Sequence, residues 1–134
     1  MNKDNGSESK RTRILLCDDT KDIRLLLNTE FGLHDDLEIV AEAENGREAV
    51  SLADEHHPDV VVLDLAMPEM DGLEALPEIR KVSPESQVIV LSSYDANSIQ
   101  AAAISLGASR FMDKSCLPWE IADAVKEVVD PTET

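Results

Sequence analysis

The sequence has few aromatic residues and no long apolar run, and both shortages narrow what the protein can be. Aromatic residues make up 3% of the 134 residues, whereas hydrophobic residues make up 43%. A core can form, but aliphatic side chains must fill most of it. No segment approaches the roughly 18 consecutive apolar residues of a membrane helix, and the polar start of the chain does not resemble a secretory signal. We therefore expect a single cytoplasmic domain with no membrane partner.

Basic residues and cysteines are also scarce. The chain has 12 Lys and Arg against 28 Asp and Glu, which gives a formal net charge of −16. Nucleic acid and anionic membranes would repel such a chain, so we expect no nucleic acid binding by this chain alone. The two cysteines, Cys17 and Cys116, lie in no C-x-x-C or metal-ligand spacing and are expected to be free thiols.

Short aliphatic runs alternate with amphipathic stretches along the chain, and this alternation predicts an α/β fold. The predicted strands are 13–17, 37–41, 59–63, 87–91 and 109–112, and the predicted helices are 21–31, 47–56, 73–82, 97–106 and 118–129. Polar tails are expected at 1–11 and 131–134, which leaves one domain over 12–130. The pair Asn45-Gly46 alone would indicate a hairpin, but the helical periodicity after it favours a helix. The prediction is a doubly wound parallel sheet of five strands with five helices.

Ligand-binding residues in a parallel α/β sheet follow the carboxyl ends of its strands. In this chain the polar residues at those places are Asp18 and Asp19 after the first strand, Asp64 after the third, Ser92 after the fourth and Lys114 after the fifth. Taken singly, each could be a helix cap or a solvated surface residue. Together, three carboxylates would repel one another by roughly 1–4 kcal/mol per pair at ~4 Å unless a cation offset the repulsion. Ligands that are all oxygen favour a hard cation, and Mg²⁺ is the expected one.

Phosphoryl transfer is the chemistry that these groups would support. With Mg²⁺ bound, one carboxylate can attack a phosphoryl group while the metal, a hydroxyl and an ammonium group stabilise its equatorial oxygens. Asp64 is the best candidate nucleophile because it ends a buried strand alone, whereas Asp18 and Asp19 form a pair suited to the metal. The sequence therefore predicts an acyl phosphate on Asp64.

These residues resemble the receiver domains of two-component response regulators, over about residues 13–129. The motifs that carry the resemblance are the acidic pair Asp18-Asp19, the segment Asp64-Leu65-Ala66-Met67-Pro68-Glu69-Met70-Asp71-Gly72, which matches D-x-x-M-P-x-x-[DN]-G, the hydroxyl of Ser92, the aromatic ring of Phe111, and Lys114. The resemblance implies a flavodoxin-like fold with strand order 2-1-3-4-5. It also implies that Mg²⁺ is held by Asp18, Asp19, Asp64 and the backbone carbonyl of Ala66, and that Ser92 and Phe111 form a switch.

The resemblance further implies a role in signalling. A histidine kinase would supply the phosphoryl group, and phosphorylation would change the surface formed by 97–106, 109–112 and 118–129. A second copy of the chain or a downstream protein would bind that surface. The chain would not be an enzyme, beyond catalysing its own phosphorylation and dephosphorylation. The sequences of 107–111 and 114–116 are similar to those of receivers that precede a helix-turn-helix DNA-binding domain. Two positions depart from the family pattern: Ser115 stands where many receivers have proline, and Phe111 replaces the commoner tyrosine.

Three other functions fit parts of the same pattern. An aspartyl-phosphate hydrolase of the haloacid-dehalogenase type also has an Asp nucleophile after a strand, but it typically has a second Asp two residues later, where this chain has Ala66. A flavodoxin-like nucleotide-binding module would need a Gly/Ser/Thr-rich loop after the first strand, and residues 18–22 are too acidic for that. The third alternative is a protein-interaction module that is not phosphorylated.

Overall fold

The computed structural model describes residues 11–93 and 97–129. Most of the two predicted tails therefore lies outside the described residues, since 1–10 and 130–134 are not among them. The described part of the chain alternates strands and helices throughout, as the α/β prediction requires.

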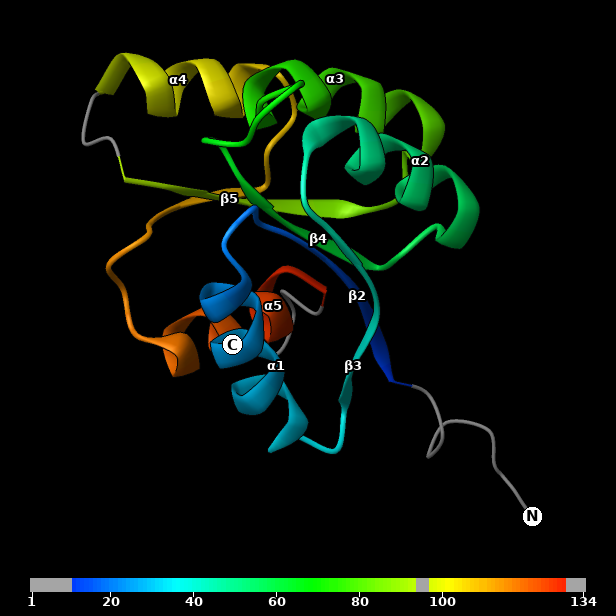
Figure 1. The fold of residues 1–134 in the computed structure, drawn as a ribbon, viewed down its shortest axis with the longest axis vertical. Helices are drawn as coiled ribbons and strands as arrows, with labels where there is room; N and C mark the ends of the chain where they lie inside the picture. Colours follow the sequence, from blue (N-terminus) through cyan, green and yellow to red (C-terminus); the bar gives the residue numbers. More distant parts are fainter. Residues whose placement is uncertain (1–10, 94–96, 130–134) are drawn as a thin grey trace.

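Five parallel strands form one sheet in the order β3-β2-β4-β5-β6. The strands are β2 (Thr12–Cys17), β3 (Leu37–Ala43), β4 (Val60–Asp64), β5 (Gln87–Ser92) and β6 (Arg110–Asp113). Counted along the described chain this order is 2-1-3-4-5, which confirms the predicted topology. The helices α1 (Lys21–Gly32) and α5 (Pro118–Val129) cover one face of the sheet, and α2 (Gly46–His56), α3 (Gly72–Val82) and α4 (Asn97–Ser105) cover the other (Figure 1).

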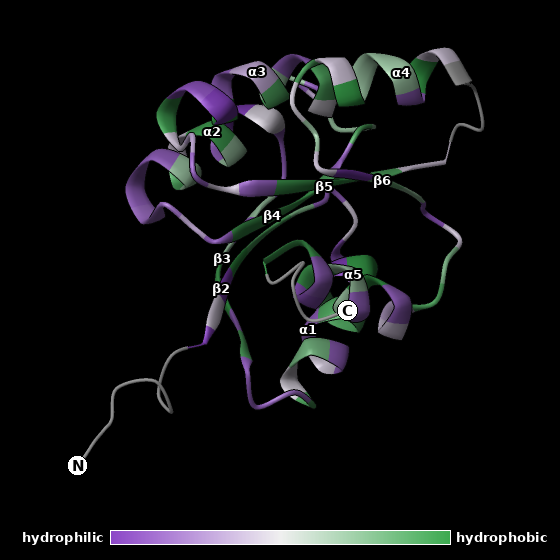
Figure 2. Cartoon of the chain, turned by 180° about the vertical axis from the view of Figure 1, so that it is seen from behind, coloured by the Kyte–Doolittle hydropathy of each residue, from purple (hydrophilic) through white to green (hydrophobic). Residues whose placement is uncertain are grey.

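The sheet divides the buried residues into two clusters because successive side chains of a strand point to opposite faces. In β4, Val61 and Leu63 join the cluster that includes residues of α2, α3 and α4, whereas Val60 and Val62 join the cluster that includes residues of α1 and α5. Every residue of β4 is buried, as expected for a parallel strand covered on both faces. Figure 2 shows the central strands mainly in the hydrophobic colour and the hydrophilic segments over the helices and loops.

The predicted bounds of the elements differ from the observed ones by at most two residues. The Asn45-Gly46 pair begins a helix, as predicted, because the side chain of Asn45 caps α2 by accepting a hydrogen bond from the amide of Glu48 at 2.8 Å. One feature was not predicted. The pairing of β2 with β3 shifts by one residue after Ile14, which leaves Val40 without a partner in the ladder.

Two further findings concern the thiols and the membrane. Cys17 is buried and Cys116 partly buried, and both are free thiols, as predicted. Burial raises the pKa of the Cys17 thiol, and the charges of Asp18 and Asp64 raise it further. Among the described helices, none is both long and apolar enough to cross a membrane.

Candidate functional site

Three carboxylates converge at the carboxyl ends of two neighbouring strands. Asp18 and Asp19 follow β2, and Asp64 is the last residue of β4, which pairs with β2. One ligand oxygen from each of the three lies within 4.8 Å of the others. Asp18 and Asp64 are each only 1% exposed, whereas Asp19 faces solvent. The structure therefore brings together the three acids that the sequence placed at this edge.

The hydrogen bonds of the two buried acids leave one oxygen unsatisfied. In Asp64, Oδ1 accepts from the amide of Ala66 at 3.1 Å and Oδ2 accepts from Nζ of Lys114 at 2.9 Å. In Asp18, Oδ1 accepts from the amide of Thr20 at 2.8 Å. Oδ2 of Asp18 forms an ion pair with Nζ of Lys114 at 3.3 Å, but no donor among residues 11–93 and 97–129 makes a well-aligned hydrogen bond to it. A buried carboxylate oxygen without a donor is costly, and a hard cation among three carboxylates would satisfy it. The residues present therefore fit a divalent metal ion.

Lys114 is held beside the acids by its backbone and by its loop. Its amide donates to the carbonyl of Ser92 at 2.9 Å, which ties the residue after β6 to the end of β5. In the same loop, Oδ1 of Asp113 accepts from the amide of Ser115 at 2.8 Å and from its hydroxyl at 2.7 Å. These two bonds lower the pKa of Asp113. The loop after β6 is thus ordered by side-chain hydrogen bonds at the position where many receivers have proline.

The charges at the site perturb each other's ionisation. Burial raises the pKa of Asp64, and the charge of Asp18 raises it further, while the hydrogen bond from Lys114 partly opposes the rise. For Lys114, burial alone would lower the pKa, but the hydrogen bond to Asp64 and the charges of Asp64 and Asp18 outweigh it and raise the pKa. Lys114 therefore stays cationic. The site has three carboxylates and one ammonium group, so it is short of positive charge.

A groove opens beside this cluster. It has a volume of about 450 Å³ and is lined by Thr20, Ile23, Ser93, Asp113, Lys114 and Ser115. Lys114, Asp113 and the hydroxyl groups place polar atoms along it, and Ile23 supplies an apolar wall. A reactant could therefore reach the buried acids from this side.

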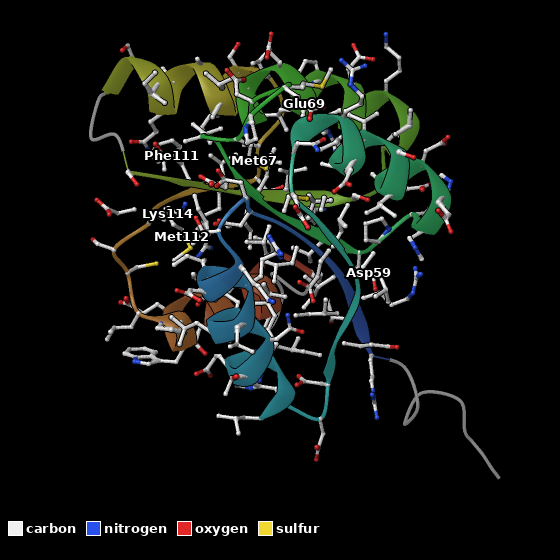
Figure 3. The ribbon with its side chains drawn as sticks, viewed as in Figure 1. Asp59, Met67, Glu69, Phe111, Met112 and Lys114 are labelled. Carbon is white, nitrogen blue, oxygen red and sulfur yellow. The ribbon has the colours of Figure 1, made fainter. Side chains whose placement is uncertain are left out.

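Ser92 and Phe111 lie on the same face of the sheet. Asp64 pairs with Leu91, so Ser92, 1% exposed, lies one residue beyond Asp64 at the end of β5. Phe111 pairs with Val90 on β6, is half-buried and packs against the core cluster that includes Ala103 of α4. Figure 3 shows Phe111 on the α4 side of the sheet and Lys114 toward the opposite side. A movement of Ser92 would therefore first change the packing on the face of the sheet that α4 covers.

The loop after β4 is fixed by two close backbone approaches. A Cβ on Gly72 would lie 2.5 Å from the carbonyl oxygen of Asp64, and a Cβ on Gly46 would lie 2.1 Å from that of Met70. The amide of Gly46 also donates to Met70 at 2.8 Å. Glu69, which lies in this loop between Asp64 and Gly72, has a φ of 67°, in the left-handed region. Ala66 is exposed in this loop.

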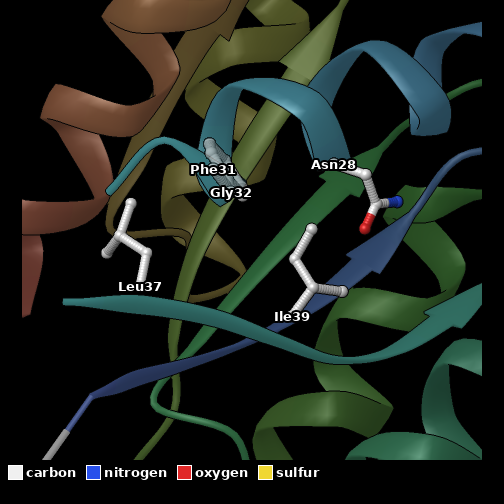
Figure 4. Close-up of a pocket in the computed structure, with 5 residues that line it drawn as sticks. All are labelled: Asn28, Phe31, Gly32, Leu37 and Ile39. Atoms are coloured by element: carbon white, nitrogen blue, oxygen red, sulfur yellow. The ribbon is translucent and has the colours of Figure 1, made fainter. Parts of the chain in front are cut away.

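A second pocket does not belong to the site. It lies between α1 and β3, has a volume of about 120 Å³, and is lined by Asn28, Phe31, Gly32, Leu37 and Ile39 (Figure 4). None of these side chains is charged. The pocket therefore offers none of the chemistry found at the acidic cluster.

Sequence reasoning missed the residues that hold the site from outside. Nη1 of Arg24 donates to the carbonyl of Asp18 at 2.6 Å, and Asp113 orders the loop of Lys114. Arg24 occupies an ordinary polar position of an amphipathic helix. Its contact could have been suspected only from its place one turn after the acidic pair.

Comparison with known proteins gives consistent results. The family profile of the Response regulator receiver domain matches residues 14–126. The chemotaxis protein CheY of Bacillus subtilis is 39% identical over 120 residues, which cover 90% of this chain and 96% of that protein. Among solved structures, the signal receiver domain of NarL from Mycobacterium tuberculosis has a TM-score of 0.86 at 30% identity and covers 90% of this chain and 98% of that one. A chain of the CheX–CheY–BeF3–Mg²⁺ complex from Borrelia burgdorferi has a TM-score of 0.82 at 25% identity, with coverages of 92% and 93%.

Proposed function

The chain belongs to the response-regulator receiver family of two-component systems, and from that premise we propose that Asp64 accepts a phosphoryl group from a histidine kinase when Mg²⁺ is bound beside it. The observation that carries this proposal is the convergence of three carboxylates within 4.8 Å, with Lys114 hydrogen-bonded to Asp64. The similar complex from Borrelia burgdorferi contains Mg²⁺ and BeF3, which is a phosphoryl analogue, and so supports the proposal. The proposal includes the cytoplasmic location that we expected from the sequence.

The acidic residues would hold the metal. Asp18, Asp19, Asp64 and the backbone carbonyl of Ala66 are the proposed ligands, and a Mg²⁺ ion bound by them would supply positive charge to the oxygens of the phosphoryl group. Oδ2 of Asp18 is available for this role because no donor among the described residues satisfies it. Asp19 is exposed at the mouth of the cluster, where an ion would enter.

The transfer itself is a displacement at phosphorus. A carboxylate oxygen of Asp64 forms a bond to phosphorus while the P–N bond to the donor imidazole breaks, and the electron pair of that bond stays on the imidazole nitrogen. Lys114, 2.9 Å from Asp64, is close enough to donate to an oxygen of the transferred group. The groove beside Lys114 would give the donor its access.

Phosphorylation would then change the α4–β6–α5 surface. A phosphoryl group adds roughly −1.5 to −2 charges and new acceptor oxygens, which would draw in the hydroxyl of Ser92. Phe111 lies one strand over on the same face and could fill the space that Ser92 leaves. Because Phe111 lacks a tyrosine hydroxyl, we expect it to favour inward packing even before phosphorylation. Exposed Ile104 and Leu106 at the end of α4 would offer apolar contact to a second copy or a downstream protein.

The alternatives are less consistent with the site. A haloacid-dehalogenase-type hydrolase typically needs an acid at the position of Ala66, which is an exposed alanine. A module that only binds proteins would have no need of an unsatisfied carboxylate oxygen buried next to a lysine.

The proposal predicts that acetyl phosphate and Mg²⁺ will add one phosphoryl group to the chain, at Asp64. Intact mass spectrometry followed by peptide mapping measures this directly. Asp64→Asn should not be labelled, because its amide is not a nucleophile. Asp59→Asn is a matched control, since Asp59 lies near the opposite end of the sheet and bonds the amide of Arg13 (Figure 3). It should be labelled like the wild type.

The same samples test the switch. BeF3 with Mg²⁺ should shift the NMR signals of α4, β6 and α5 in the wild type, and Ser92→Ala should lose most of that shift. Normal labelling of Asp64→Asn, or labelling that persists in excess chelator, would overturn the proposed phosphoryl transfer. A full shift in Ser92→Ala would overturn only the switch.

A further inference from the structure

Arg24 contacts the acidic pair through the backbone. It lies on the first turn of α1, and its side chain is only 12% exposed. Its Nη1 donates to the carbonyl oxygen of Asp18 at 2.6 Å. We propose that Arg24 is a positioning residue for metal binding, which fixes the turn between β2 and α1 so that Asp18 and Asp19 face the ion together. This inference rests on the proposed function of the acidic cluster.

The turn depends on few other restraints. The amide of Asp18 donates to Ala43 at 3.0 Å, and this bond continues the β2–β3 ladder. The amide of Thr20 donates to the carboxylate of Asp18. Thr20 is the N-cap of α1 but makes no side-chain cap bond. Arg24 therefore supplies the side-chain bond that ties the carbonyl of Asp18 to the helix.

Arg24 is itself held in place by the side chains of Glu42 and Asn28. Its Nε donates to Oε1 of Glu42 at 3.0 Å, and Nδ2 of Asn28 donates to Oε2 of the same carboxylate at 2.8 Å. Asn28 also donates to the backbone carbonyl of Arg24 at 2.9 Å. Both oxygens of Glu42 thus accept hydrogen bonds. The guanidinium group is held by two of its nitrogens, Nε bonded to Glu42 and Nη1 bonded to the carbonyl of Asp18. Glu44 adds a longer ion pair at 3.7 Å.

Geometry and charge make different predictions for Arg24. A guanidinium group can donate from Nε to Glu42 and from Nη1 to Asp18 at the same time, because its donors point in fixed directions. A lysine keeps the positive charge but has a single nitrogen, so it cannot reproduce the fork. If Arg24 acts by position, lysine will not replace it. If Arg24 acts only through its charge, Arg24→Lys will bind Mg²⁺ like the wild type, and Arg24→Gln will bind it more tightly because a nearby positive charge repels the ion.

The test is the affinity of the 134-residue chain for Mg²⁺ alone, measured by isothermal titration calorimetry. Arg24→Lys and Arg24→Gln should both bind Mg²⁺ about tenfold more weakly than the wild type, at the low end of the effect of losing an outer-shell partner. Lys126→Gln is the matched control, because it removes a cation that pairs with Asp36 and contacts His34. It should bind Mg²⁺ like the wild type.

Two further measurements keep the outcome decisive. Circular dichroism checks that each variant is folded, and Glu42→Gln offers a milder change, which keeps one acceptor for Arg24 and should weaken Mg²⁺ binding about twofold to threefold. Wild-type affinity in a folded Arg24→Lys would overturn the positioning role, since the two hydrogen bonds of the fork would then be unnecessary. If the wild type itself bound no Mg²⁺, the proposed function would fail and the role of Arg24 in metal binding with it, whereas normal binding by Arg24→Lys would overturn the role of Arg24 alone.

Discussion

Asp64 is a buried carboxylate whose surroundings favour its protonated form. Burial and the charge of Asp18 raise its pKa, in spite of the hydrogen bond from Lys114. Below the ordinary value of 3.8 the carboxyl is protonated in both the folded and the unfolded chain. As the pH rises past that value the unfolded chain ionises first, so the free energy of unfolding falls until the folded carboxyl ionises as well. At neutral pH the charge of Asp64 therefore destabilises the metal-free fold.

Because the charge of Asp64 destabilises the metal-free fold at neutral pH, we expect Asp64→Asn to stabilise the metal-free chain. In chelator at pH 7 its melting temperature should exceed that of the wild type by a few degrees, since about 1 kcal/mol corresponds to roughly 3–5 °C for a chain of this size. The difference should shrink as the pH falls toward 3.8, because the folded wild-type carboxyl becomes protonated before that value is reached. Scanning calorimetry from pH 7 down to pH 4 measures both effects.

Added Mg²⁺ should reverse the order. The ion would bind the folded wild type and raise its melting temperature, whereas Asp64→Asn would respond less because it has lost a ligand. Asp59→Asn, at the residue just before β4, should follow the wild type throughout. A lower melting temperature for metal-free Asp64→Asn would contradict the destabilising effect of the Asp64 charge.

At this same scale, the sequence could predict the residues that directly follow strands. Asp18, Asp64 and Lys114 meet because parallel strands end at one edge of the sheet, and that geometry holds for any such fold. Arg24 could not be predicted in the same way. Its proposed role depends on Glu42, which lies 18 residues later in the sequence, on strand β3.

At the scale of elements, α2 and the loop after β4 are joined by a contact that leaves no room for a side chain. The amide of Gly46 donates to the carbonyl of Met70, and a Cβ on Gly46 would lie 2.1 Å from that same oxygen. Gly46→Ala should therefore push the loop away and destabilise the fold by about 1–3 kcal/mol, the usual cost of overpacking. Urea denaturation followed by circular dichroism measures the change.

Gly32 provides the matched control for this prediction. Like Gly46, Gly32 lies at a helix terminus, since it is the last residue of α1. Nothing, however, lies within 4 Å of the position that its Cβ would take. Gly32→Ala should be neutral or stabilising by up to about 1 kcal/mol. Equal effects of the two substitutions would mean that the contact between Gly46 and Met70 contributes nothing.

The elements themselves were predictable because their hydrophobic periods are clear. The residues of β4 are all apolar up to Asp64, and the start of α2 carries its own cap in Asn45. The register shift between β2 and β3 was not predictable, because it depends on how two strands pair and not on the period of either one. The contact of Gly46 with Met70 was hidden for the same reason.

At the scale of the whole molecule, the topology follows from the alternation of strands and helices. Parallel strands joined by helices need crossovers that are nearly always right-handed, and this rule leaves few arrangements. The particular order of the strands was supplied by the family resemblance, since periodicity alone does not give it. The observed order agrees with it.

The charge of the whole chain predicts that it will not bind DNA. The net charge is −16, and several exposed cations are already paired with acids, namely Lys81 with Glu78, Arg110 with Glu127 and Lys126 with Asp36. A protein that binds duplex DNA must replace condensed counterions with free cationic side chains, and these residues do not provide them. Fluorescence anisotropy with a labelled duplex should therefore show no saturation at micromolar concentrations of the 134-residue chain, either at 150 mM salt or at about 50 mM, where electrostatic binding would be stronger by orders of magnitude. The phosphorylated chain, which is still more acidic, should give the same result. Tight binding that weakens steeply with added salt would show that the cations of this chain form a surface which their acidic partners do not neutralise.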